Sequence, residues 1–263
     1  MEADTNLSRL IVAIPAYNEE KTIGHVIAKV KRCISIISDC QILIVDDGSS
    51  DRTIDVAKKA GADIIVSHRS NHGINNAYGT CIRYALKYDP EVICTIDADA
   101  QFNPAEIETL TAPILTRETD VVIGSRFIST RNNKQIPILN LVTNKLMANF
   151  VSLLIGIKLH DVESGFRAIS AKAARSLNLS GIGSFSHDMI LDLTSKGFGI
   201  LEVPVSVKYY KDRTSRVIKG LLKYGFVSFK SIVLKTLSIR KLYVTSSNRM
   251  NEAAVIYESS RVR

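Results

Sequence analysis

The chain has 263 residues, enough for one large α/β domain or two small ones with a sizeable core. Its composition, 46% hydrophobic and 23% charged, is that of an ordinary globular protein and excludes low-complexity, collagen-like and disulfide-scaffold chains. The 34 Lys and Arg residues exceed the 26 Asp and Glu residues by 8, which favours an anionic partner: nucleic acid, a membrane surface or a phosphorylated ligand.

Short β-branched runs alternate with helical patterns through the first half of the chain. The predicted strands are residues 10–14, 41–45, 63–66, 92–96 and 120–123, and the predicted helices between them are residues 19–35, 51–60, 74–87 and 104–115. This alternation predicts an α/β fold with a doubly wound, mostly parallel sheet and right-handed crossovers. Ligands of such sheets bind beyond the carboxyl ends of the strands.

The pattern changes after residue 123. A polar stretch at 129–135 leads to a long predicted helix that ends near Gly156, then to residues 164–170, a helix at 185–196 and two short strands around Glu202 and residues 205–209. A helical pattern returns at 215–241, and the last residues are polar and predicted to be loosely held. We expect a catalytic domain at 1–210, a basic amphipathic segment at 211–243 and a polar tail at 244–263.

Cysteine usage and apolar run length bear on the compartment. The cysteines Cys33, Cys40, Cys81 and Cys94 show no metal or disulfide spacing, which favours a reduced compartment. The first residues lack the layout of a secretory signal, and no apolar run approaches the roughly 18 residues that span a bilayer. We therefore expect a cytoplasmic protein without a membrane span.

Acidic clusters follow three of the predicted strands. After the first strand, Tyr17 can stack on a nucleobase, and after the second, Asp46 and Asp47 can accept hydrogen bonds from a base or ribose. Helix capping by Asn18 and Ser50 is the alternative explanation. After the fourth strand, Asp97 and Asp99 can share a divalent cation with a diphosphate, and no glycine-rich phosphate loop competes for that task.

Six motifs in order resemble one family. They are IPAYNEE (14–20), DDGSSD (46–51), DADAQ (97–101), GSRF (124–127), SGFR (164–167) and EVPV (202–205). This set is similar to that of the family-2 glycosyltransferases of GT-A (Rossmann-like) fold, in the dolichyl- or polyprenyl-phosphate mannosyltransferase-like branch. The resemblance covers residues 9–216. It implies an inverting, metal-dependent transfer from a nucleotide sugar, such as GDP-mannose or UDP-glucose, to a polyprenyl or dolichyl phosphate.

The resemblance also implies residue roles. The residues matched to nucleotide-sugar binding are Pro15, Tyr17, Glu19, Val45, Asp47, Asp97, Ala98 and Asp99. A Mg²⁺ or Mn²⁺ ion is expected at Asp99 and Gln101. The residues matched to the acceptor phosphate are Arg126, Arg213, Ser215 and Arg216. Of these positions, Asp97, Asp99, Arg126 and Arg216 are expected to act in catalysis.

Several positions keep alternatives open. Arg126 and Arg167 can each bind a phosphate or pair with Asp161 or Glu163. Where the family usually has a Lys, this chain has Asn75, and where many members have an Arg, it has Asn140, with Arg131, Lys134 or Lys145 as substitutes.

The acceptor determines whether a base is needed. A lipid phosphate is largely dianionic at neutral pH and needs none. A soluble or saccharide acceptor requires one, for which Asp188 is the candidate and its neighbour His187 is more typical of packing.

The positive charge is concentrated in one segment. Residues 208–241 contain ten Lys or Arg and one acid, a net +9 that leaves −1 for the rest, and their apolar residues recur at helical spacing. This pattern is typical of an interfacial helix on anionic lipid, with a helix packed on the domain as the alternative. We expect peripheral attachment to the cytosolic membrane face. A nucleic-acid-binding protein is the rival from another class, but the segment lacks a recognisable reader motif.

Overall fold

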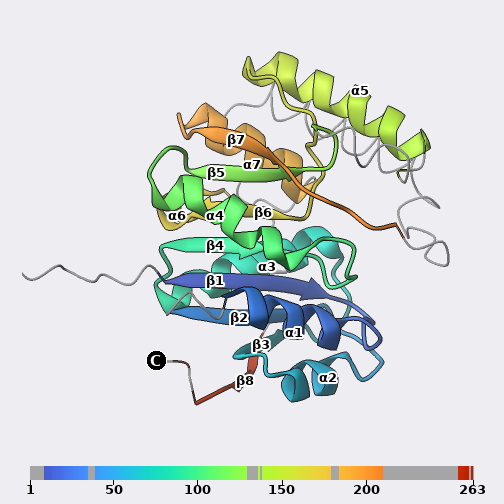
Figure 1. Ribbon diagram of the computed structural model, residues 1–263. Coiled ribbons are helices and arrows are strands. Elements are labelled where there is room, and N and C mark those ends of the chain that lie inside the picture. Colours follow the sequence, from blue (N-terminus) through green and yellow to red (C-terminus); the bar gives the residue numbers. More distant parts are fainter. Residues whose placement is uncertain are drawn as a thin grey trace, which may run out of the picture.

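The computed structural model (Figure 1) describes residues 9–34, 39–128, 136, 138–178, 184–209, 254–260 and 262. These residues form an eight-stranded sheet of order β7-β5-β6-β4-β1-β2-β3-β8. The strands are β1 Leu10–Ala16, β2 Cys40–Asp46, β3 Ile64–Ser67, β4 Val92–Thr95, β5 Val121–Ser125, β6 Arg167–Ser170, β7 Ile200–Pro204 and β8 Ala254–Glu258. Strands β3, β2, β1 and β4 run parallel, as do β5 and β7, while β6 and β8 are antiparallel to their neighbours.

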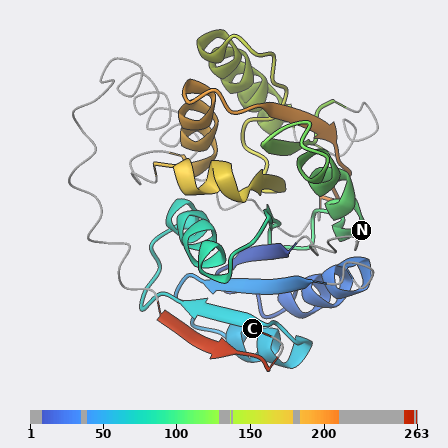
Figure 2. The same ribbon diagram turned by 90° about the vertical axis from the view of Figure 1, so that its left-hand side faces the viewer.

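Helices cover both faces of this sheet (Figure 2). They are α1 Ile23–Ile34, α2 Thr53–Ala60, α3 Ile74–Ala85, α4 Ile107–Leu115, α5 Ile138–Ile155, α6 Ala171–Ser176 and α7 Phe185–Ser195, with short 3-10 turns η1 Leu86–Tyr88 and η2 Pro104–Glu106. The apolar sides of α1, α2 and α4 pack with Val12 and Ile44 in one core. Those of α3, α5, α6 and α7 pack with Ile11 and Val45 in the other. Each buried strand feeds both cores because its side chains alternate between the faces.

The predicted fold class is confirmed. All five predicted strands of the first half are present, and each predicted helix between them is found within a few residues of its expected bounds. The helix predicted at 104–115 begins with the turn η2, where Asn103 accepts a hydrogen bond from the Ala105 backbone N–H. Parallel pairing aligns Pro15 with Val45 and Ala16 with Asp46, so the carboxyl ends of β1 and β2 lie side by side. The division into a domain at 1–210 and later segments stays a prediction.

The end of the chain differs from the loosely held polar tail that the sequence predicts. Ala254–Glu258 form β8, which pairs with β3 at the edge of the sheet. The Ser259 hydroxyl and backbone N–H both donate to Asp63, and Tyr88 hydrogen-bonds Glu258. Asp63 and Ser259 are 196 residues apart in the chain, so local composition cannot reveal this pairing. The basic segment at 211–243 lies outside the described residues.

Candidate active site

The loops after β1 and β2 are tied to each other by side chains. The Asn18 backbone N–H donates to Ser49 Oγ over 2.9 Å, and the Ser50 N–H donates to Asn18 Oδ1 over 2.8 Å. The Glu19 N–H donates to Thr53 Oγ1 over 2.8 Å. Asn18 therefore joins the two loops, in a left-handed backbone conformation with φ +53° that Asn tolerates better than most residues. This bracing fixes the backbone on both sides of Tyr17, which is partly buried.

Asp47 is a buried carboxylate bound by three protein donors. Its Oδ1 lies 2.6 Å from His68 Nδ1 and accepts from the His72 N–H at 3.0 Å, while Oδ2 accepts from the Gly73 N–H at 2.8 Å. The other His68 nitrogen lies 2.9 Å from Thr80 Oγ1. Asp47 thus anchors the loop that begins α3. Its predicted contact with a nucleotide stays a prediction.

Asp46 is a further candidate site residue, which the motif matching did not select. Its Oδ2 accepts from Ser67 Oγ at 3.0 Å and from the Ser49 N–H at 3.2 Å. Its buried Oδ1 has no hydrogen-bond partner among the described residues. A buried carboxylate oxygen without a donor costs free energy, so this oxygen is suited to a ligand donor. Asp46 and Asp47 are adjacent acids of the DDGSSD motif, so the motif indicates both as candidate ligand-binding residues.

Asp97 lies partly buried just after the end of β4. The Tyr78 hydroxyl donates to its Oδ1, and Gly165 passes so close that an added Cβ would come within 2.5 Å of both carboxylate oxygens. Burial raises the pKa of Asp97, while the hydrogen bond from Tyr78 and the charges of Arg167 and Arg126 lower it. Tyr78, which none of the six motifs contains, and Gly165 of the SGFR motif therefore shape the environment of this carboxylate.

The other members of the D-x-D motif form a compact turn. The Gln101 N–H donates to Asp99 Oδ1 over 3.0 Å, and Ala100 has φ +63°. Ala98 is buried, whereas Asp99 and Gln101 are partly buried. Within the described ranges, no three His, Cys, Asp or Glu side chains gather as a metal site. Oxygens from Asp99 and Gln101 still suit a Mg²⁺ or Mn²⁺ ion whose remaining positions a diphosphate fills.

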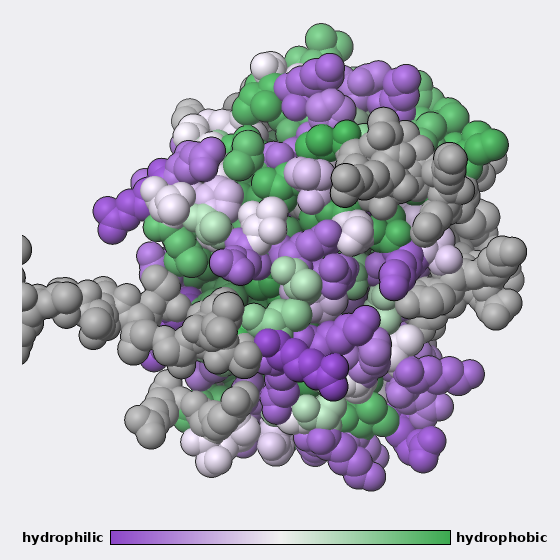
Figure 3. Space-filling model, in the orientation of Figure 1, coloured by the Kyte–Doolittle hydropathy of each residue, from purple (hydrophilic) through white to green (hydrophobic). Residues whose placement is uncertain are grey.

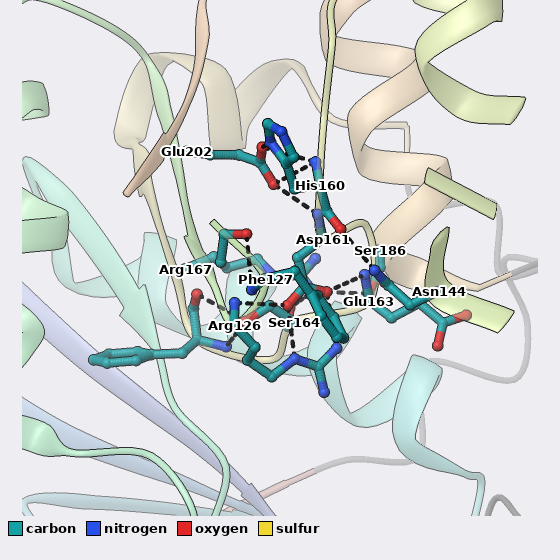
Figure 4. A network of polar contacts seen from close by, with 12 residues as sticks. Arg126, Phe127, Asn144, His160, Asp161, Glu163, Ser164, Arg167, Ser186 and Glu202 are labelled. Carbon is teal, nitrogen blue, oxygen red and sulfur yellow. Dashed lines mark hydrogen bonds and ion pairs between the residues drawn. The ribbon is translucent and has the colours of Figure 1, made fainter. Parts of the chain in front are cut away.

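Arg126 is held by a buried ion pair at the end of β5 (Figure 4). Its Nε lies 2.6 Å from Asp161 Oδ2 and its Nη2 lies 2.8 Å from Oδ1, a bidentate pair, and its backbone N–H donates to the same carboxylate over 3.1 Å. The nearby Asp161 charge raises the pKa of Arg126 despite burial, so the guanidinium stays charged. The pairing alternative is thus observed, and a phosphate role stays a prediction for a side chain that is 20% exposed.

Glu202 of β7 positions the loop that carries Asp161. Its carboxylate accepts from the Asp161 N–H over 2.7 Å, and from the backbone N–H and Nδ1 of His160 over 2.8 Å each. Figure 4 shows these groups in one chain of contacts that reaches Arg126. The side chain of Asn144 on α5 adds a 2.6 Å bond to the His160 carbonyl. Glu202 of the EVPV motif therefore helps to position Arg126 of the GSRF motif through Asp161.

Arg167 has a structural role in the described residues. It is buried, donates to the Ser164 carbonyl and to Ser186 Oγ, and lies 5.6 Å from the ring centre of Tyr78. The rings of Tyr78 and Phe185 stack at 5.4 Å. Arg167 therefore joins β6 to the start of α7.

The start of α7 carries His187 and Asp188, both buried. His187 Nε2 lies 3.7 Å from Glu163 Oε1, and neither ring nitrogen has a hydrogen-bond partner among the described residues. Burial, together with the Arg167 charge, lowers the pKa of His187 to about 4, so the ring is neutral. Burial raises the pKa of Glu163. Asn75 Oδ1 accepts from the Phe185 N–H over 3.0 Å, so the residue that replaces the family's Lys braces α7.

Tyr209 lies near both Arg126 and Asp99. Burial raises the pKa of its hydroxyl, the Arg126 charge lowers it, and Asp99 is near enough to raise it. The structure therefore brings the D-x-D turn and Arg126 to the same edge of the sheet, with the loops after β1 and β2 beside them. The predicted acceptor residues Arg213, Ser215 and Arg216, and the substitutes Arg131 and Lys134, lie outside the described residues, as does the side chain of Asn140.

The mostly parallel sheet, with acidic side chains at its strand ends and a paired arginine beside them, has the GT-A fold of glycosyltransferases. The family model of glycosyl transferase family 2 matches residues 11–177, and the chain belongs to that family. A glucosyl-3-phosphoglycerate synthase from Mycobacterium tuberculosis, solved with Mn²⁺, UDP and phosphoglyceric acid, superposes with a TM-score of 0.65. Its identity is 19%, and the match covers 88% of this chain and 78% of that one.

Relatives in sequence extend over most of the chain. An uncharacterized protein of Methanocaldococcus jannaschii is 34% identical over 88% of this chain and 94% of its own. A polyprenol monophosphomannose synthase of Mycolicibacterium smegmatis is 30% identical over 75% and 77%. A UDP-N-acetylglucosamine–dolichyl-phosphate N-acetylglucosaminyltransferase of Methanococcus voltae is 29% identical over 86% and 95%. The chain is therefore a glycosyltransferase with relatives that act on polyprenyl or dolichyl phosphate.

Proposed function

We propose that this glycosyltransferase moves a hexose from a nucleotide sugar to a polyprenyl or dolichyl phosphate, with inversion and with the aid of Mg²⁺ or Mn²⁺. The observation that carries the proposal is the convergence of Asp97, Asp99 and the charged Arg126 at one edge of the sheet. The relatives named for polyprenol and dolichyl phosphate support the acceptor class.

The donor nucleotide binds at the ends of β1 and β2 in this proposal. Pro15 and Val45 are neighbours in register at the ends of these strands, and Tyr17 and Glu19 follow in the braced loop. Asp47 fixes the neighbouring loop, and Asp46 Oδ1 offers an acceptor for a base or ribose N–H or O–H. Carboxylates at these positions can accept hydrogen bonds from the N–H and O–H groups of the nucleoside. This recognition needs no glycine-rich phosphate loop.

The diphosphate and the metal bind at the end of β4. Asp99 and Gln101 would hold the ion, with Asp97 behind them and Ala98 against the diphosphate. When bound, such an ion supplies Lewis-acid stabilisation to the departing diphosphate. Asp97 must be ionised to assist, which the Tyr78 hydroxyl and Arg167 favour against the pKa increase caused by burial.

The acceptor phosphate approaches from the side of Arg126. An oxygen of this phosphate forms a bond to the anomeric carbon of the sugar. At the same time the bond between that carbon and the nucleoside diphosphate breaks, and the electron pair of the broken bond leaves with the diphosphate. Arg126, fixed by Asp161, positions the phosphate through its remaining exposed donor surface. Arg213, Ser215 and Arg216 are proposed to assist it. A phosphate dianion already has the nucleophilic oxygen, so no base is needed.

A soluble or saccharide acceptor is the second candidate. The observation in its favour is Asp188, a buried carboxylate on the first turn of α7 that would serve as the base for a hydroxyl nucleophile.

In the first proposal, the protein works at the cytosolic membrane face, attached through the basic segment at 208–241. In the second, no lipid surface is required. No helix within the described ranges has the length and apolarity to cross a bilayer.

A donor-by-acceptor panel tests the proposal. Labelled GDP-mannose and UDP-glucose are offered with polyprenyl phosphate or a soluble sugar, in Mg²⁺ or Mn²⁺, and the product is partitioned into organic solvent. We expect label in the organic phase and a loss of at least about a hundredfold in kcat for Asp99→Asn. Asp55→Asn, an exposed acid of α2, is the matched control. Label that stays entirely in the aqueous phase contradicts the lipid acceptor, and unchanged turnover by Asp99→Asn contradicts the metal site.

A further inference from the structure

Helix α5 has apolar side chains on two opposite sides. One side, with Asn144, Ala148 and Val151, is buried against the core. The other side leaves Ile138, Val142, Leu146 and Leu153 exposed by 81%, 46%, 67% and 80%. A helix that is apolar all round is normally enclosed by protein or lipid, so the exposed side of α5 requires a separate explanation.

The exposed residues form one continuous face. At about 100° per residue, Ile138, Val142, Leu146 and Leu153 fall within an arc of roughly 80°, on the side away from Ala148 and Val151. Lys145 and Asn149 fall beside them. We call Ile138, Val142, Lys145, Leu146, Asn149 and Leu153 the α5 outer face. Figure 3 shows hydrophobic surface at the upper right, where Figure 1 places this helix.

Exposure of this face to water is costly. Burying a Leu or Ile side chain contributes about 1.5–3 kcal/mol, so four such residues left in water forgo several kcal/mol. Contiguous apolar patches of this kind on soluble proteins mark interaction surfaces. The α5 outer face is therefore a docking surface, and its charge identifies the partner.

The chain around α5 is purely basic. Residues 127–160 contain Arg131, Lys134, Lys145 and Lys158 and no Asp or Glu. Packing the face against a second copy would bring Lys145 towards its counterpart, and covering it with residues 208–241 would place a segment of net charge +9 on a basic helix. An anionic lipid surface satisfies both the apolar residues and the cations.

We propose that the α5 outer face docks on an anionic lipid bilayer, with Leu146 and Leu153 inserted at the boundary between headgroups and acyl chains. The inference rests on the proposed function in one respect, namely that the acceptor is a lipid. Helix α5 packs on α7, which carries Asp188, and its Asn144 bonds to the loop that holds Arg126 through Asp161. Docking through α5 would bring the acceptor side of the site to the lipid.

The test is cosedimentation of the full-length protein with vesicles of mixed phosphatidylcholine and phosphatidylglycerol. We expect the double variant Leu146→Gln/Leu153→Gln to bind at least about tenfold more weakly than the unmodified protein. Leu115→Gln and Ile256→Gln, which replace exposed apolar residues of α4 and β8, are the matched controls and should bind as the unmodified protein does. Thermal unfolding midpoints check that every variant is folded.

Charge variants refine the test. Lys145→Gln should weaken binding to these vesicles by about fivefold, whereas Lys59→Gln on α2, at the other end of the molecule in Figure 1, should not. Unchanged binding by the folded double variant overturns the inference, as does a dimer in solution that the double variant dissociates. Vesicle binding needs no sugar transfer, so α5-dependent binding without a lipid product would refute the proposed function and leave this inference standing.

Discussion

Two buried aspartates, Asp47 and Asp161, stand on the proposed donor side and the proposed acceptor side of the site, and their carboxylates bind different kinds of partner. Asp47 is bound by two backbone N–H groups and by His68, so its carboxylate fixes the conformation of the loop before α3. Asp161 binds a guanidinium at two points and is itself fixed by Glu202. The donor side is thus held by neutral backbone donors, and the acceptor side by an ion pair that keeps a cation in place.

The contrast bears on how each side tolerates change. A carboxylate that accepts from backbone N–H groups can be replaced by an amide at moderate cost, since one acceptor oxygen remains. A carboxylate that compensates a partly buried cation cannot, because the cation is left unpaired. We therefore expect the acceptor side to be the more sensitive to substitution of its aspartate.

The largest effect is expected for Asp161→Asn. Removing one partner of a buried ion pair should lower the free energy of unfolding by about 4 kcal/mol and release Arg126 from its position. Urea denaturation measures the first effect, and sugar transfer under folding conditions measures the second. Asp120→Asn, at the other end of β5, is the control. A loss below about 1 kcal/mol would show that Arg126 is adequately solvated without Asp161.

A pH effect of intermediate size is expected from His187, also on the acceptor side. The unfolded chain protonates this residue near pH 6.5, whereas the folded protein does so only near pH 4, so unfolding takes up a proton between these values. The free energy of unfolding therefore falls as the pH drops from 6.5 to 4, by about 3 kcal/mol from this residue. Denaturation at several pH values should show a flatter profile for His187→Gln, with the exposed His25→Gln unchanged.

The smallest effect is expected on the donor side. Asp47→Asn should cost about 2 kcal/mol, because the amide cannot accept from all three present donors. Asp46→Asn should cost less than about 1 kcal/mol, since Oδ2 makes the hydrogen bonds seen here, and should raise the KM for the donor if Oδ1 meets the nucleoside. Equal losses of stability for the two variants would remove the distinction between them.

Local sequence predicted most of the architecture, because buried parallel strands have their own signature of short apolar β-branched runs. The run that became β1 and the D-x-D turn after β4 needed no distant information. Arg126 was left with two alternatives, since the choice depends on Asp161, which lies 35 residues further on. The bonds from His72 and Gly73 to Asp47 likewise depend on a loop that only the fold brings near.

Strand β8 shows the opposite case. Its residues form a short apolar run within a polar stretch. That run becomes a strand only because it pairs with the edge of β3, which local sequence does not indicate. The Asn75 side chain is similar, because its role appears only when the start of α7 arrives 110 residues later. Motif resemblance predicts residue types at the reaction centre but not the residues that support them.

The register of β8 has a consequence for the basic segment. Ala254 pairs with Ser67 at the carboxyl end of β3, and Pro204 pairs with Ser125 at the carboxyl end of β5. The chain between these points therefore leaves and rejoins the sheet on the ligand-binding edge, across seven strand spacings or roughly 34 Å. The eleven Lys and Arg residues between Pro204 and Ala254 are thus joined to the ligand-binding edge at both ends. Under the proposed function, this double attachment raises their effective concentration for a phosphate bound at that edge.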